Sequence, residues 1–226
     1  MSTDLGGLYA AARGRITSIL AELPPKAEGQ VCPATPEWTV HDVLAHLRGI
    51  TEDVRTGNLD GVTTDPWTAA QVQRHRETTM AELLAGWAAD APLVEAVLSA
   101  PGGEAVQRAV FDIHAHEADL RGALGMPGEL PDEFGAWAAP IFAESLIAKA
   151  CEHGLPEVQI VTHEGDHMGS ANAPTVLRVS RFELFRSQLG RRSAGQVAAY
   201  DWGTTDPSPY LAHYFVFGPR IDDLAE

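Results

Sequence analysis

Residues 109–125, AVFDIHAHEADLRGALG, hold a carboxylate, an imidazole and a second carboxylate at helical spacing. Asp112 and His116 are four residues apart, and Asp119 follows three residues later. Positions three and four apart share one face of a helix, so a helix here would align the three side chains. An Asp–His pair one turn apart can hold a divalent cation if another helix supplies a third ligand. The alternative is an ordinary surface hydrogen bond between Asp112 and His116.

The third ligand is predicted in a second helix, which begins near Trp38. Thr39 can cap this helix with Asp42 as its capping-box partner, and an apolar face follows with His46 beside it. His46 is therefore expected to face the bundle interior, either as a hydrogen-bonded core histidine or as a metal ligand. Two nitrogens and one oxygen leave a coordination position open, as in catalytic zinc sites. Zn²⁺ is the leading candidate, but Fe²⁺, Mn²⁺, Co²⁺ and Ni²⁺ also suit these ligands.

Asp119 is predicted to support the site without binding the cation. It lies about one turn beyond His116, where its carboxylate can accept the free ring N–H and fix the tautomer. An ordinary salt bridge from Asp119 to Arg108 or Arg121 is the alternative.

The helices that must position these residues follow from apolar spacing and from proline and glycine breaks. Four amphipathic helices predict a four-helix bundle over residues 1–126, whose interior suits a metal. After a Gly/Pro-rich linker, residues 132–226 are predicted to form a small α+β domain, so the chain is α+β overall. The expected bundle helices cover 4–23, a stretch from 39 onward, 68–89 with a bend or break at 90–92, and 104–124, with a proline-rich loop at 24–37. The expected later elements are a helix at 132–153, a hairpin of strands 158–162 and 175–179, a helix at 181–189 capped by Ser180, a further short helical piece, and a strand at 210–217.

Charge and composition exclude several classes of partner. The formal net charge of −15 argues against nucleic acid and against an anionic membrane surface. The first residues do not resemble a signal peptide, and no apolar run is long enough to span a membrane. Two cysteines, Cys32 and Cys151, are too few for a disulfide framework. A cytoplasmic protein with reduced thiols is expected, and its oligomeric state is left open.

Two further motifs in the second half of the chain contain residue types that could bind a metal or an anion. His163–His167 matches the zinc-protease pattern H-E-x-x-H, but it follows a predicted strand, whereas that chemistry requires a helix. Arg191 and Arg192, just after the glycine that ends a predicted helix, can form a fork for a substrate or cosubstrate carboxylate. The alternative for these arginines is solvation, or pairing with Glu183 and the acidic tail.

Two of the segments described above resemble a known family. WTVHDVLAHLRG, which contains His46, and FDIHAHEADLRGALG, which contains Asp112 and His116, are similar to the two signatures of mycothiol-dependent maleylpyruvate isomerase-like proteins. These belong to the wider DinB-like superfamily of metal-binding four-helix bundles. SRFELFRSQLGRRS (180–193) and YFVFGPRIDDL (214–224) resemble the second domain of that family.

The resemblance implies a divalent metal, usually zinc, held by His46, Asp112 and His116, with mycothiol as cosubstrate. The isomerases have a glutamate at the position that matches Asp112, and the shorter aspartate is common in relatives of unassigned activity. The resulting hypothesis is a metal-dependent enzyme that uses a small thiol to isomerise or conjugate a small electrophile. A hydrolase that needs no thiol and a non-catalytic metal-binding module are the alternatives.

Overall fold

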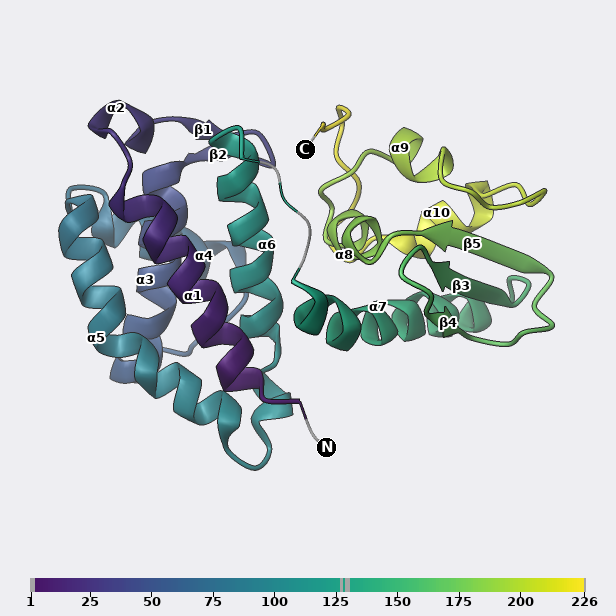
Figure 1. Ribbon diagram of the computed structural model, residues 1–226, viewed down its shortest axis with the longest axis horizontal. Helices are drawn as coiled ribbons and strands as arrows, with labels where there is room; N and C mark the ends of the chain where they lie inside the picture. Colours follow the sequence, from purple (N-terminus) through teal and green to yellow (C-terminus); the bar gives the residue numbers. More distant parts are fainter. Residues whose placement is uncertain (1–2, 127, 129–130, 226) are drawn as a thin grey trace. The chain divides into compact units, whose positions relative to one another are not determined.

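The structure, a computed structural model, describes residues 3–126, 128 and 131–225 (Figure 1). The chain divides into two compact units, residues 1–128 and residues 129–226. The first is helical and the second combines helices with a small sheet, so the predicted α+β class is confirmed.

Four long helices form the body of the first unit. Helix α5 packs against α1 and α3, and α6 packs against the same two helices, which closes the bundle. A fifth helix, α4, packs on α3. The long helices are α1 (Leu5–Ala21), α3 (Val40–Thr56), α5 (Met80–Ser99) and α6 (Arg108–Ala123); the shorter elements are α2 (Pro25–Glu28), β1 (Val31–Cys32), β2 (Thr35–Thr39), α4 (Asp65–His75) and the 3₁₀ turn η1 (Gly103–Val106).

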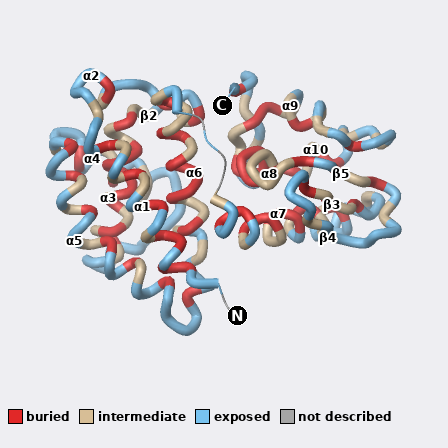
Figure 2. Tube along the Cα trace, viewed as in Figure 1, coloured by how far each residue is buried: buried red, intermediate tan, exposed pale blue. Residues whose placement is uncertain are grey.

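Apolar side chains fill the interior of the bundle, where Figure 2 shows buried stretches recurring along each long helix. Trp87 and Leu83 of α5, Leu44 of α3 and Ile113 of α6 have no exposed surface. Burying a side chain of this size stabilises a fold by roughly 1.5–3 kcal/mol, so this core holds the helices in place.

The predicted start of α3 is confirmed. The Thr39 hydroxyl accepts a hydrogen bond from the backbone N–H of Asp42, and the Asp42 carboxylate accepts one from the backbone N–H of Thr39. This capping box satisfies two backbone donors that the first turn of a helix leaves unpaired.

The expected helix at 68–89 is wrong in its boundaries. It is two helices, α4 and α5, because Thr79 and Glu82 form a second capping box that starts a new helix at Met80. The break expected at 90–92 is absent, and α5 continues through Pro92. The fourth bundle helix likewise begins later than expected, at Arg108 after the η1 turn.

The proline-rich stretch 24–37 is also more ordered than a loop. It contains α2 and an antiparallel pair of short strands, β1 and β2, with Val31 opposite Thr39. Proline suits the first turn of a helix, where α2 has Pro25, and the edge positions of a strand, where β2 has Pro36. Strand β2 leads directly into α3 and carries Trp38.

Over its described residues, 131–225, the second unit has one long helix, a small sheet and three short helices. The sheet has the strand order β4-β3-β5. The elements are α7 (Asp132–Glu152), β3 (Val158–Thr162), β4 (His167–Met168), β5 (Thr175–Val179), α8 (Arg181–Gln188), α9 (Ala194–Ala198) and α10 (Ser208–Tyr214). Ser180 caps α8 as predicted, through a hydrogen bond from the backbone N–H of Glu183.

The predicted hairpin of β3 and β5 is wrong, because these strands pair in parallel from Val158 and Thr175 to Thr162 and Val179. The hairpin partner of β3 is β4, which occupies its other edge. The connection from β3 to β5, residues 163–174, is about as long as a parallel crossover requires.

The strand expected at 210–217 is wrong as well. Tyr210 and Tyr214 are both buried, and their four-residue spacing is that of the helix α10. Both rings pack near Trp202, which explains why this apolar stretch folds as a helix.

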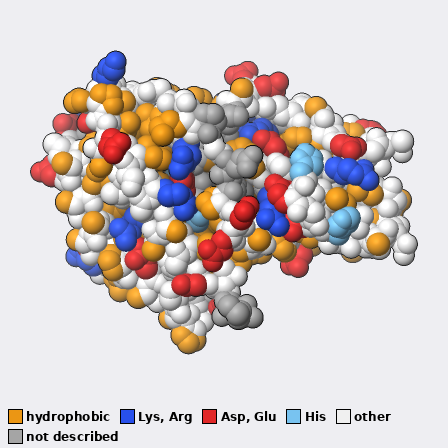
Figure 3. All heavy atoms as spheres, in the orientation of Figure 1, with side chains coloured by type: hydrophobic (Ala, Val, Ile, Leu, Met, Phe, Trp, Pro, Cys, Tyr) orange, Lys and Arg blue, Asp and Glu red, His pale blue; other side chains and the backbone are white. Residues whose placement is uncertain are grey.

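Acidic and basic side chains are interspersed on the described part of the face drawn in Figure 3. Cys32 is buried and Cys151 exposed, and both are free thiols. Among the described residues, no helix has an apolar stretch of the length that a bilayer crossing needs.

Candidate metal centre

Two histidines and an aspartate converge inside the bundle. His46 lies on α3, and Asp112 and His116 lie one turn apart on α6. Nε2 of His46 is 3.4 Å from Oδ2 of Asp112, and Nε2 of His116 is 3.5 Å from Oδ1 of the same carboxylate. One potential ligand atom from each residue lies within 4.8 Å of the others. Within the described part of the chain, this is the one cluster of three or more such side chains.

The packing of α3 against α6 brings these residues together. Val43 and Leu47 are buried on the face of α3 next to His46, and His46 is buried with them, so its ring lies inside the bundle. On α6, Val110, Ile113 and Leu120 are buried as the helical spacing predicted. The sequence therefore places the site on two helices that the core fixes relative to each other.

The two histidines of the site are buried, whereas the aspartate is partly exposed. The side chains of His46 and His116 are 4% and 6% exposed, whereas that of Asp112 is 34% exposed. The exposed part of the site is therefore the side chain of Asp112.

The donor set fits a divalent cation. Oδ2 of Asp112 is buried and lacks a hydrogen-bond partner among the described residues, although Nε2 of His46 is close. A buried carboxylate oxygen without a hydrogen bond is costly, and a cation between it and the two imidazoles would satisfy it. Two imidazole nitrogens and one carboxylate oxygen match the three-ligand pattern of open zinc sites.

Each imidazole has a polar partner on its other nitrogen. Nδ1 of His116 lies 3.0 Å from Oδ2 of Asp119, and Nδ1 of His46 lies 2.8 Å from Oε1 of Gln71 on α4. Asp119 thus sits where the sequence placed it, while Arg121 contacts Glu117. Gln71 was missed. Gln71 and His75 are the two buried residues of α4. Their four-residue spacing, which places both on one face of a helix, was the sequence signal that could have identified Gln71.

Trp38 lies against both imidazoles. Its ring centroid is 5.0 Å from that of His46 and 5.6 Å from that of His116, and the two imidazoles are 5.1 Å apart in an edge-to-face arrangement. Strand β2 therefore places an aromatic ring next to the two imidazoles.

The charges of the site shift the pKa values of its members. Burial disfavours the charged form of His116, but the negative charge of Asp112 and the hydrogen bonds to Asp112 and Asp119 outweigh it and raise its pKa to about 9. Burial likewise raises the pKa of Asp112, but the charges of His116 and His46 prevail and hold it below its usual range. The carboxylate is therefore ionised at neutral pH, as a metal ligand must be.

His114 and Glu117 of α6 have partners outside the candidate centre. His114 is buried with Nδ1 2.8 Å from the Val110 carbonyl oxygen, and burial lowers its pKa to about 4. Glu117 accepts two hydrogen bonds from Arg15 at 2.8 and 2.7 Å, and a further pair from Arg121.

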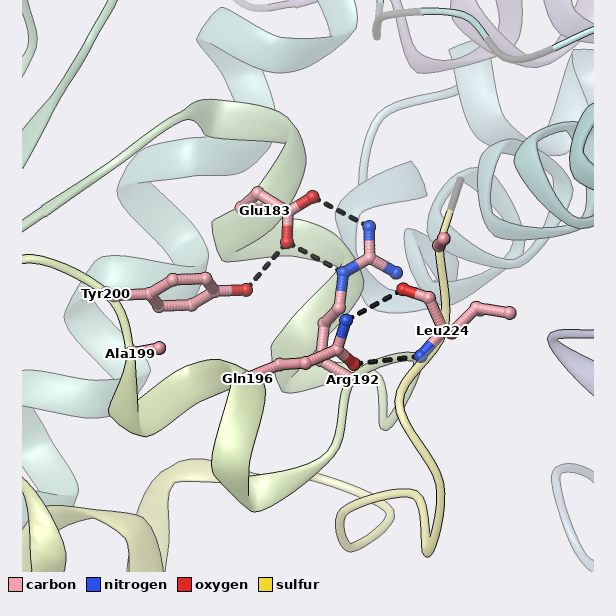
Figure 4. A pocket seen from close by; sticks show the side chains of 7 residues that line it. Glu183, Arg192, Gln196, Ala199, Tyr200 and Leu224 are labelled. Carbon is pink, nitrogen blue, oxygen red and sulfur yellow. Dashed lines mark hydrogen bonds and ion pairs between the residues drawn. The ribbon is translucent and has the colours of Figure 1, made fainter.

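The two arginines predicted to bind a cosubstrate lie in the second unit. Arg192 is buried, and its Nε and Nη2 atoms each donate to Glu183 at 2.7 Å. The Tyr200 hydroxyl donates to the same carboxylate (Figure 4). Nη1 of Arg191 donates to the Leu189 carbonyl oxygen. The pairing with Glu183 is one of the alternatives weighed from the sequence.

A cavity of about 400 Å³ lies beside this ion pair. It is lined by Glu183, Arg192, Gln196, Ala199, Tyr200, Leu224 and Ala225 (Figure 4). Gln196 holds the C-terminal segment at its edge, because its side-chain amide bonds to both the N–H and the carbonyl oxygen of Leu224.

The motif at His163–His167 does not have the geometry of a zinc protease. His163 lies in the turn after β3 and His167 lies in β4, and both are exposed. The two rings therefore lack the shared helical face that the mechanism requires.

Fold and site together define a helical bundle with a candidate metal centre between two of its helices. The family model of the DinB superfamily matches residues 8–127, which is just over half of the chain. The chain therefore belongs to the DinB superfamily, whose members bind metals. Neither the curated proteins nor the solved structures include a significant match to it.

Proposed function

We propose that this protein is a divalent-metal-dependent cytoplasmic enzyme that uses a small thiol, mycothiol, to isomerise or conjugate a small electrophile. The observation that carries the proposal is the convergence of His46, Asp112 and His116, of which Asp112 has a partly exposed side chain. The resemblance of two segments to mycothiol-dependent maleylpyruvate isomerase-like proteins supports the choice of thiol.

Each residue has a defined role in the proposal. His46 and His116 supply neutral nitrogen ligands through Nε2, and Asp112 supplies the anionic ligand. Asp119 accepts the N–H of His116 Nδ1 and so turns Nε2 toward the cation position. A divalent cation held by these residues, with Zn²⁺ the leading candidate, would lower the pKa of a bound thiol by several units, so that the thiol would be ionised at neutral pH.

The surroundings suit a small reactant. Trp38 offers an apolar face beside the two imidazoles, while the exposed side of Asp112 allows entry. Arg191 and Arg192 are proposed to contribute positive charge to binding of a substrate or cosubstrate carboxylate. For Arg192 this requires that the ion pair with Glu183 be shared or exchanged.

The proposal is tested in two stages. Protein purified without chelator should contain about one divalent ion per chain, and His116→Ala should lose it. Mycothiol added to the Co²⁺-substituted protein should add a near-ultraviolet absorption band, because a thiolate ligand gives sulfur-to-cobalt charge transfer, and should also shift the visible d–d bands. Wild-type protein that neither retains nor takes up a divalent ion would refute the metal function.

The same experiment separates the rival functions. Hydrolysis of a substrate at an equal rate with and without mycothiol would favour a hydrolase. A metal-loaded protein whose spectrum is unchanged by any thiol would favour a non-catalytic metal-binding module.

A further inference from the structure

A chain of buried polar contacts leads from His46 away from the candidate centre. Nδ1 of His46 lies 2.8 Å from Oε1 of Gln71, and Nε2 of Gln71 donates to Oδ2 of Asp53 at 2.8 Å. Gln71 is 0% exposed and Asp53 is 1% exposed. Arg74 and Asn58 donate to the other carboxylate oxygen, Oδ1, at 2.9 and 3.0 Å. Buried polar groups are costly unless hydrogen-bonded, so these contacts hold one another in position.

The direction of each hydrogen bond follows from Asp53. A carboxylate only accepts, so the NH₂ group of Gln71 must face Asp53 and its carbonyl oxygen must face His46. A carbonyl oxygen also only accepts, so Nδ1 of His46 must carry the proton. Nε2 of a neutral imidazole then has the free lone pair. Nε2 is the atom that lies 3.4 Å from Asp112, in the candidate centre.

We propose that Asp53, acting through Gln71, is a positioning residue that holds His46 in the tautomer able to bind a cation. This inference rests on the proposed metal function of His46, Asp112 and His116. It assigns a role in metal affinity to two residues that do not themselves reach the cation position. His116 obtains the same support directly from Asp119, whereas His46 obtains it through an intervening amide.

The close approach of α4 to α3 supports this role. A Cβ atom on Gly49 would lie 2.5 Å from Cβ and 2.7 Å from Cγ of Gln71, both nearer than real contacts allow. Glycine at this position therefore lets Gln71 come close enough to α3 to contact both His46 and Asp53, which lie on either side of Gly49 in the sequence.

The decisive variant is Asp53→Asn. Arg74 and Asn58 are both donors, so they should continue to donate to the carbonyl oxygen of the new amide. The NH₂ group of that amide must then face Gln71. Gln71 must then reverse its own amide and present NH₂ to Nδ1 of His46. That arrangement places the imidazole proton on Nε2, where it blocks the cation. We expect zinc affinity to fall by about 10–100-fold, the usual effect of losing a ligand's hydrogen-bonded support.

A compensating variant distinguishes this effect from general damage to the buried network. In Gln71→Glu combined with Asp53→Asn, the carboxylate and the amide exchange places. The carboxylate now at position 71 accepts from both His46 and the amide at position 53, so His46 regains its Nδ1–H tautomer. We expect the double variant to bind zinc at least about tenfold more tightly than Asp53→Asn alone. A gain of that size would cancel the smallest loss of affinity expected for Asp53→Asn.

The matched control is Glu52→Gln. It also converts an acid to its amide on α3, and it also removes a carboxylate that pairs with Arg74, but it leaves Gln71 untouched. Its zinc affinity should stay close to that of wild type. Circular dichroism of each zinc-free variant checks that the bundle is folded.

A direct measurement on unaltered protein covers the case in which the variants fail to fold. Long-range ¹H–¹⁵N spectra of zinc-loaded wild type should show a protonated Nδ1 and a zinc-bound Nε2 for His46. Zinc bound through Nδ1, or equal zinc affinity in Asp53→Asn and wild type, would overturn the role of Asp53 and Gln71. Absence of zinc binding by wild type would instead overturn the proposed metal function itself.

Discussion

Asp119 lies three residues beyond His116 on α6, and its Oδ2 atom is 3.0 Å from Nδ1 of His116. Asp119 is fully buried, so solvent does not compete for this contact. The hydrogen bond fixes the rotation of the ring and leaves Nε2 directed at Asp112, 3.5 Å from Oδ1. The carboxylate of Asp119 thus orients one proposed ligand, His116, toward another, Asp112.

This contact predicts the effect of removing Asp119. Asp119→Ala should lower zinc affinity by about 10–100-fold, because the ring loses its orientation and part of its basicity. Competition with a chromophoric chelator measures the affinity.

Asp119→Asn provides the matched control for that substitution. Its amide oxygen can still accept from Nδ1 of His116, so it should retain more affinity than the alanine variant. Equal affinities in wild type and Asp119→Ala would contradict the assigned role.

The pKa of His116 predicts that zinc binding depends on pH. Because the pKa in the metal-free fold is about 9, His116 is protonated at pH 7 and must lose a proton to bind zinc. The apparent affinity should therefore rise about tenfold per pH unit up to about pH 9. Calorimetric titrations in buffers of different ionisation enthalpy should detect about one proton released per zinc at pH 7. Release near zero at that pH would contradict the predicted charge on His116.

The same shift predicts an opposite trend for stability without metal. The folded-state pKa of His116 is raised above its unfolded value of 6.5, so its contribution is complete below about pH 6.5 and is lost as pH rises through 9. Metal-free protein should lose roughly 2–3 kcal/mol of unfolding free energy over this range. Zinc-loaded protein should not show this loss. Denaturant titrations at about pH 6 and pH 9 test both expectations, and a metal-free protein equally stable at both would refute the coupling.

Trp38 predicts an optical signal for an occupied site. Its ring centroid lies 5.0 Å and 5.6 Å from those of the two proposed histidine ligands, so Cu²⁺ or Co²⁺ bound by them should quench its fluorescence. Because the chain has five tryptophans, only part of the emission should be lost.

Trp38→Phe isolates this signal. The variant should still bind the metal, since the ring supplies no ligand atom, but should lose most of the quenching. Quenching of the same amplitude in Trp38→Phe would place the bound metal elsewhere.

The parts of the site that could be predicted from the sequence lie within single elements. Asp112, His116 and Asp119 follow from the fixed periodicity of a helix, and the Thr39 cap follows from hydrogen bonding over three residues. The approach of His46 to α6 was an expectation based on a bundle, and the structure brings the three residues within 4.8 Å.

Contacts between elements account for what was missed. Gln71 reaches His46 only because α4 is a separate helix packed on α3. That separation was missed because the capping box at Thr79, which starts α5, was not recognised in the sequence. In the second unit, the pairing partner of β3 depends on the path of a loop, which strand periodicity does not specify. Tyr210 and Tyr214 fit a helix once their packing on Trp202 is known.

Gly49 on α3 lies against Gln71 on α4, and a larger residue there should force the two helices apart. Gly→Ala in a helix normally stabilises by about 1 kcal/mol. At Gly49 the added methyl would meet Gln71 at 2.5 Å, and overpacking of this kind typically costs about 1–3 kcal/mol. Gly49→Ala should therefore lower the unfolding free energy, and it should also weaken zinc binding because Gln71 is pushed away from His46.

Gly14→Ala is the control for Gly49→Ala, since Gly14 lies exposed within α1 and a Cβ atom there meets nothing within 4 Å. It should raise stability by about 0.5–1 kcal/mol and leave zinc affinity unchanged. Urea titrations and chelator competition on the two variants measure both quantities. If Gly49→Ala matched Gly14→Ala in stability and zinc binding, the tight packing of α4 on α3 would have no part in supporting His46.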